Sequence, residues 1–63
     1  MTQKELLYVE DAIGHEQSVI CILENILNNL EDSSLASFMS KQINKHDSIK
    51  EKMLKLLEDK SNE

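Results

Sequence analysis

An apolar heptad repeat dominates the first half of the chain. From residue 6 to residue 27 every seventh position holds a branched apolar side chain, and a second apolar row runs beside the first. The two rows are formed by Leu6, Ile13, Ile20 and Leu27, interleaved with Val9, Leu23 and Leu30. This spacing puts both rows on one face of an α-helix and is typical of helices that pack lengthwise against each other. Thr2 and Glu5 are spaced as a capping box, which predicts a helix start near Gln3.

The apolar stripe of this first helix is broader than one neighbouring helix covers. Ala12, Val19 and Ile26 form a third apolar row, and Tyr8 and Ile22 form part of a fourth. A helix packed on one side only needs a narrower stripe. We therefore expect the first helix to contact two others.

Acidic and hydroxyl side chains interrupt the apolar pattern around residues 31–34, and Asp32 or Ser33 is the expected N-cap of a second helix. We predict a first helix at about 3–30, a turn at about 31–33, a second helix at about 34–58 and a frayed tail at 59–63. The apolar row of the second helix is Leu35, Met39, Ile49, Met53 and Leu56, flanked by Phe38, Ile43 and Leu57. Because the turn is short, the helices must run antiparallel, so the predicted fold is an all-α hairpin.

The length of the chain predicts self-association. A domain of 63 residues buries only about 60% of the surface that its unfolded chain exposes, and a single cysteine, Cys21, cannot form an internal disulfide. A metal or a second copy remains as the source of stability. We expect a homodimer, with two hairpins forming a four-helix bundle. Its core would consist of Leu6, Ile13, Ile20, Leu27, Met39, Ile49, Met53 and Leu56.

Charge and hydropathy narrow the range of partners. The net charge is −5 and the chain has no arginine, so a nucleic-acid partner is not expected. No apolar run approaches the roughly 20 residues of a membrane span, and the first residues lack the pattern of a signal peptide. A cytoplasmic, reducing compartment is the expectation. Residues 1–32 carry a charge of −6 and residues 33–63 carry +1, which favours laying the two halves against each other.

Polar residues interrupt the apolar rows at a few positions. Glu16 lies one heptad from Val9 and from Leu23, and His46 lies one heptad from Met39 and from Met53. Helical geometry therefore points both side chains into the bundle.

The position of the turn predicts how these polar residues meet. Pairing about a turn between Asp32 and Ser33 places Ile20 beside His46 and Glu16 beside Ile49. Glu16 and His46 would then lie one helical turn apart, within reach of a hydrogen bond or a shared metal.

Two interpretations of this pair remain open. Polar residues inside small helical bundles commonly hydrogen-bond each other and fix register or oligomeric state. Alternatively, a two-fold dimer would gather two carboxylates and two imidazoles, a set that suits zinc or iron, with His15 as a further ligand. A surface pair between His15 and Asp11, four residues earlier, accounts for His15 equally well.

The sequence contains no catalytic signature, so we expect a protein that is not an enzyme and needs no cofactor. It has no glycine-rich phosphate loop, no zinc-protease motif and no serine triad. Cys21 has no neighbouring base and is expected to be a packing residue. Gly14 either permits the close approach of another backbone or is tolerated in mid-helix.

Residues 5–16, ELLYVEDAIGHE, followed by KHD at 45–47, resemble the helical hairpin of the spore coat F family and, more distantly, half of a ferritin-like bundle. Ferritin-like hairpins contribute a Glu from one helix and a Glu-x-x-His from the other. Glu16 and His46 match that pattern, whereas Ile43 replaces the second carboxylate. The resemblance implies a four-helix architecture, a link to sporulation and a spore-associated location. A separate alternative is that the hairpin supplies a pair of helices to a larger protein assembly. The Ser-Gln-Glu-Leu-Asp stretch of another hairpin family, the aspartyl-phosphate phosphatases of sporulation, is absent.

Overall fold

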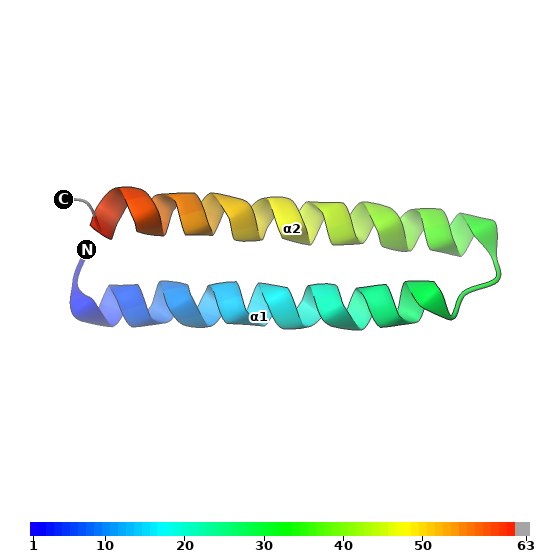
Figure 1. Ribbon diagram of the computed structural model, residues 1–63, viewed down its shortest axis with the longest axis horizontal. Helices are drawn as coiled ribbons and strands as arrows, with labels where there is room; N and C mark the ends of the chain where they lie inside the picture. Colours follow the sequence, from blue (N-terminus) through cyan, green and yellow to red (C-terminus); the bar gives the residue numbers. More distant parts are fainter. Residues whose placement is uncertain (62–63) are drawn as a thin grey trace.

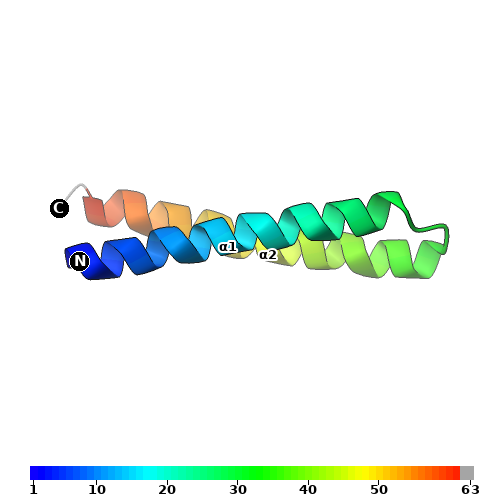
Figure 2. The ribbon, with the colours of Figure 1, turned by 90° about the horizontal axis from the view of Figure 1, so that it is seen from below.

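Two antiparallel helices make up the part of the chain that the computed structural model describes, residues 1–61 (Figure 1). Helix α1 spans Gln3–Asn28 and helix α2 spans Ser33–Ser61, and these residues include no strand. Residues 29–32 join the helices at one end, and the N-terminus lies beside the last turn of α2 at the other. The hairpin measures 47 × 15 × 10 Å, and its helices cross at a shallow angle (Figure 2). The predicted all-α antiparallel hairpin is confirmed.

The capping box at the start of α1 is also confirmed. The Thr2 hydroxyl oxygen accepts a hydrogen bond from the Glu5 amide at 3.1 Å, and the Thr2 amide donates to the Glu5 carboxylate at 2.7 Å. These two bonds satisfy two amides that the helix itself leaves without acceptors. The Thr2 amide and then the Thr2 side chain lower the pKa of Glu5. The local sequence thus fixes where α1 begins.

The end of α1 and the start of α2 differ slightly from the prediction. Helix α1 ends at Asn28 instead of near residue 30, because the Asn29 side-chain amide donates to the Asn25 carbonyl at 2.7 Å and closes the last turn. Helix α2 begins at Ser33 and continues to Ser61, so the predicted end near residue 58 is wrong. Lys60 in its last turn complements the helix dipole. Of the predicted frayed tail, residues 59–61 are helical, and 62–63 lie outside the described residues.

Asp32 is the N-cap of α2. One of its carboxylate oxygens accepts hydrogen bonds from the Ser34 hydroxyl at 2.6 Å, the Ser34 amide at 2.8 Å and the Leu35 amide at 2.9 Å. The Ser34 hydroxyl, followed by the Leu35 and Ser34 amides, lowers the pKa of Asp32 below its ordinary value of 3.8. All three donors favour the ionised carboxylate.

Acid is expected to weaken the hairpin through this cap. Because folding lowers the pKa of Asp32, its contribution to stability is complete above 3.8 and is lost as the pH falls through the lowered pKa. Urea unfolding followed by circular dichroism should show the free energy of unfolding decreasing between about pH 5 and about pH 2. Asp32→Asn keeps a capping oxygen but does not titrate, so its curve should be flatter. Equal slopes for both proteins would contradict this assignment.

The helices meet along two rows of side chains, which we call the seam. In α1 the seam continues the apolar heptads and includes Glu16, and in α2 it follows alternating steps of three and four residues. The seam of α1 is Leu6, Val9, Ile13, Glu16, Ile20, Leu23, Leu27 and Leu30, and that of α2 is Ala36, Met39, Ile43, His46, Lys50, Met53 and Leu57. Within residues 1–60, Ile20 alone is buried, at 4% exposed, and the other members are half-buried.

The row predicted for α2 only partly coincides with the seam. Met39 and Met53 belong to it, whereas Leu35, Ile49 and Leu56 lie on the next row and remain exposed. Those three side chains are uncovered in the hairpin and available to another molecule. In α1, Gly14 has no atom within 4 Å of the position that a Cβ would occupy, so α2 does not approach it closely.

Candidate functional site

A carboxylate and an imidazole meet midway along the seam. His46 Nδ1 lies 2.5 Å from Glu16 Oε2, and the two side chains are 28% and 18% exposed. The seam rows of α1 and α2 position them, since each replaces an apolar residue in its heptad. The predicted proximity of this pair is confirmed, and it is closer than expected because Glu16 lies opposite His46 instead of Ile49.

The shift in register has a local cause. The predicted pairing of Ile20 with His46 assumed a turn centred between Asp32 and Ser33, but the connection consists of residues 29–32, so its centre lies two residues earlier in the chain. Because Glu16 contacts His46 directly, this pair defines the register of α1 against α2 along the whole seam. By this register Ile20 lies at the level of Ile43.

Lys50 extends the polar cluster by one helical turn. Its ammonium group donates to Gln17 Oε1 at 2.8 Å and lies 3.8 Å from Asp47 Oδ1. The Lys50 side chain is only 19% exposed, so it is a member of the seam. Sequence reasoning missed this role. The signal was the series 43, 46, 50, 53 and 57, whose steps of three and four residues define the seam of α2.

The hairpin gathers two possible metal ligands, not three. Across residues 1–61 no group of three or more His, Cys, Asp or Glu side chains lies close enough to hold a metal ion. His15, predicted as a further ligand, is exposed and does not join Glu16 and His46. A structural zinc site takes four ligands and a catalytic one takes three. One hairpin therefore supplies a hydrogen-bonded pair, and a metal would need ligands from a second chain.

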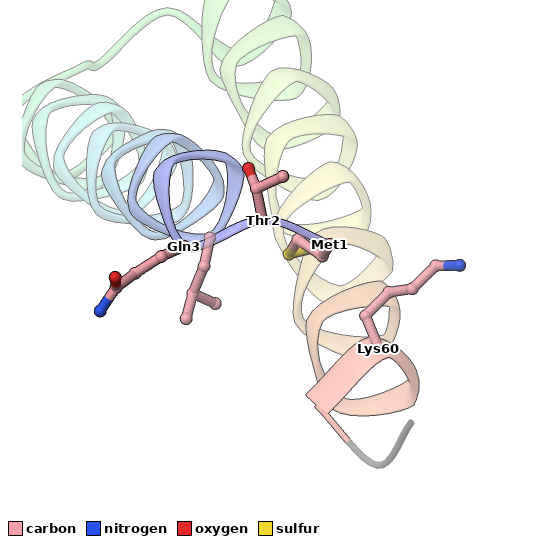
Figure 3. A pocket seen from close by; sticks show the side chains of 5 residues that line it. Met1, Thr2, Gln3 and Lys60 are labelled. Atoms are coloured by element: carbon pink, nitrogen blue, oxygen red, sulfur yellow. The ribbon is translucent and has the colours of Figure 1, made fainter.

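Two shallow hollows lie at the open end of the hairpin. One, of about 280 Å³, is lined by Met1, Thr2, Gln3, Leu6 and Lys60 (Figure 3). The other, of about 430 Å³, shares Met1 and Lys60 and adds Glu5, Tyr8 and Val9. Cys21, expected to be a packing residue, is exposed in the hairpin, and Gln17 Nε2 lies 3.5 Å from its sulfur.

Comparisons with protein-family models, with curated proteins and with solved structures find no match to this chain. Over residues 1–61, neither helix has a stretch that is both long and apolar enough to cross a membrane. The features of this chain that bear on function are therefore the seam, the Glu16–His46 pair and the exposed surfaces of the hairpin.

The Glu16–His46 contact can be measured by a double-mutant cycle. Glu16→Ala and His46→Ala each leave a half-buried partner without its hydrogen bond, so each should lower the free energy of unfolding by about 1–2 kcal/mol. The double variant should cost less than the sum of the two, because the second substitution has no bond left to break. Urea unfolding of the four proteins at one fixed protein concentration gives the coupling free energy between Glu16 and His46. Strict additivity would mean that the pair contributes nothing.

Proposed function

We propose that this protein is a small non-enzymatic interaction module, whose hairpin pairs with a second copy to form a four-helix bundle. One observation carries the proposal: the described part of the hairpin buries only the Ile20 side chain, while ten large apolar side chains are at least 36% exposed. Two helices alone do not enclose a core. A monomer rarely exposes so much apolar surface unless that surface binds a partner.

The polar residues of the seam fit the same role. A half-buried Glu16–His46 pair stabilises a helical bundle less than two leucines would, but it opposes registers that would leave either group unpaired. Because Lys50 also has its partners on the hairpin, these side chains favour one alignment of α1 against α2. A fixed alignment presents the exposed apolar side chains in a constant arrangement, as specific association requires.

The resemblance of residues 5–16 and 45–47 to spore coat F proteins extends the proposal to a cellular setting. In that setting the paired hairpin would be a structural component of a larger assembly in a spore-forming cell. It would be made in the cytoplasm and retained in or around the spore.

Sedimentation equilibrium of the untagged protein at micromolar concentration tests the proposal. We expect a mass near twice the monomer mass of 7.3 kDa and a thermal transition that rises with protein concentration. A folded monomer, with a melting temperature that dilution leaves unchanged, would overturn the proposal.

A metal-binding role is a second candidate, favoured by the direct contact of a carboxylate with an imidazole in the middle of the seam. If two copies bring their Glu16–His46 pairs together, four ligands of the kind that zinc and iron accept would meet. Added zinc should then raise the melting temperature of the dimer, and His46→Ala should abolish that rise. A dimer whose melting temperature ignores zinc and iron excludes this role and leaves the first proposal intact.

A further inference from the structure

The two long sides of the hairpin differ in chemistry. In an antiparallel pair of helices, the rows that flank the seam on one side come from matching heptad positions of both helices. Lys50 identifies one of these sides, since it contacts both Gln17 of α1 and Asp47 of α2. We call it the polar side. Its rows are Gln3, Glu10, Gln17, Glu24 and Glu31 in α1, and Ser33, Ser40, Asp47 and Leu54 in α2.

The opposite side, which we call the apolar side, carries most of the exposed apolar surface. It consists of the rows next to the seam and the rows beyond them. In α1 these are Glu5, Tyr8, Ala12, His15, Val19, Ile22 and Ile26, and in α2 they are Leu35, Phe38, Gln42, Lys45, Ile49, Lys52, Leu56 and Asp59. Seven of the ten exposed large apolar side chains of the described hairpin belong to these rows, each between 36% and 60% exposed.

The exposed area suits a specific dimer. A large side chain offers about 150–250 Å², so the seven exposed side chains present roughly 650 Å² together. A stable protein–protein interface covers about 800 Å² on each partner. With Ala12, Val19 and Gln42, which are half-buried between them, the apolar side reaches that range. Among the residues of the polar side, Leu54 is the only large apolar side chain that is exposed.

We infer that a second copy of this chain docks on the apolar side, and that the turns of the two hairpins lie at opposite ends of the bundle. This inference rests on the proposed self-association and specifies its geometry. In this arrangement α1 packs antiparallel to α1 of the second copy, and α2 packs antiparallel to the other α2. The two-fold axis passes at the level of Glu16 and His46, near the middle of the hairpin.

A two-fold axis pairs each position of a helix with one at an equal distance on the other side of the axis. The apolar rows meet this requirement about the level of Glu16 and His46. In α2, Leu35 and Leu56 lie eleven residues before and ten residues after His46, and Gln42 and Ile49 lie four before and three after. Rotation therefore brings Leu35 onto Leu56 of the second copy and Gln42 onto Ile49.

In α1 the rotation pairs unequal sizes, which interdigitate well. Ala12 and Ile22 lie four residues before and six residues after Glu16, and Tyr8 and Ile26 lie eight before and ten after. Rotation therefore brings the small Ala12 onto Ile22 of the second copy, and Tyr8 onto Ile26. With Glu16 opposite His46, these pairs centre on residue 17 in α1 and between residues 45 and 46 in α2, so a shift of about half a residue, roughly 0.75 Å along a helix, brings the two centres to one level.

Individual contacts, and not the net charges of the two helices, also favour turns at opposite ends. Turns at the same end would place α1 over α2 of the second copy, with Leu56 near the Glu5 carboxylate and His15 near Lys45. Turns at opposite ends leave Glu5 at the rim of the bundle and bring Lys52 beside Phe38 of the second copy, where a cation stacks on an aromatic ring. The two Lys45 side chains then meet at the rim, from which their long stems reach solvent.

Spin labels at the turn distinguish the two arrangements. Cys21 is the only cysteine, so Cys21→Ser combined with Glu31→Cys leaves one labelling site, on an exposed turn residue that caps neither helix. With turns at opposite ends, double electron–electron resonance should give a separation near the 47 Å length of the hairpin. With turns at the same end, the labels would lie on the two connections, diagonally across one end of the bundle and roughly 10–20 Å apart, and would broaden the continuous-wave spectrum.

Each outcome is decisive. A long distance that disappears on dilution with unlabelled protein supports the inference. A short distance in a protein that sediments as a dimer overturns the inference and leaves the proposed self-association standing. If no distance appears and the mass is that of a monomer, the self-association itself fails.

Discussion

Replacing Ile20 by alanine is expected to destabilise the protein by about 3 kcal/mol, the cost of removing a large side chain from a packed position. Ile20 is the one buried side chain of residues 1–60 and lies next to the Glu16–His46 level in the seam. For a protein of this size such a loss lowers the melting temperature by roughly 12–24 °C. Urea and thermal unfolding, followed by circular dichroism at one protein concentration, measure the effect.

Leu7→Ala is the control for Ile20→Ala. Leu7 lies in the same helix and is 56% exposed, away from the seam and from the apolar side. Its substitution should change the free energy of unfolding by no more than about 0.5 kcal/mol. If the free energy of unfolding falls equally in both variants, the seam does not contribute the main stabilising contacts, and α1 must pack against α2 through another face.

The architecture and the seam of α1 could be predicted from the sequence because local chemistry determines them. The Thr2–Glu5 capping box and the Asp32 cap mark both helix starts, and branched apolar residues occupy almost every seam position of α1. In that helix the most apolar row is also the row that faces α2. Periodicity alone therefore identifies it.

The seam of α2 could not be predicted in the same way. Its most apolar row, which includes Leu35 and Leu56, lies beside the seam, while the seam itself includes His46 and Lys50. Periodicity identifies apolar rows but does not say which neighbour covers each row. In α2 the apolar stripe is broader than the surface that α1 covers, and the hairpin places the more polar row inside.

The register of the candidate site depended on the turn. Glu16 and His46 were expected one helical turn apart, and they touch, because α1 ends early at the Asn29 amide and the centre of the connection lies earlier in the chain than predicted. When the predicted end of a helix is wrong by about two residues, the predicted pairing of residues is wrong along the whole antiparallel hairpin. Which side chains face each other across a hairpin is thus decided by a few hydrogen bonds at its tip.

Ile49→Lys should have the largest effect on association. Ile49 lies on the apolar side, opposite Gln42 of the second copy in the inferred dimer, and the two-fold axis introduces the new charge twice. Burying an ammonium group without a partner costs several kcal/mol, so the dissociation constant of the dimer should rise by at least about 100-fold. Sedimentation equilibrium over a range of concentrations measures that constant.

Leu54→Lys is the matched control for Ile49→Lys. Leu54 is 39% exposed and Ile49 is 36% exposed, both lie on α2, and both flank the seam, but Leu54 is on the polar side. To an isolated hairpin the two substitutions are equivalent, and both should leave its helical content nearly unchanged. The two substitutions should differ in effect only if a partner binds the apolar side. Equal dissociation constants for the two variants would therefore rule out docking on the apolar side, even if the unmodified protein is a dimer.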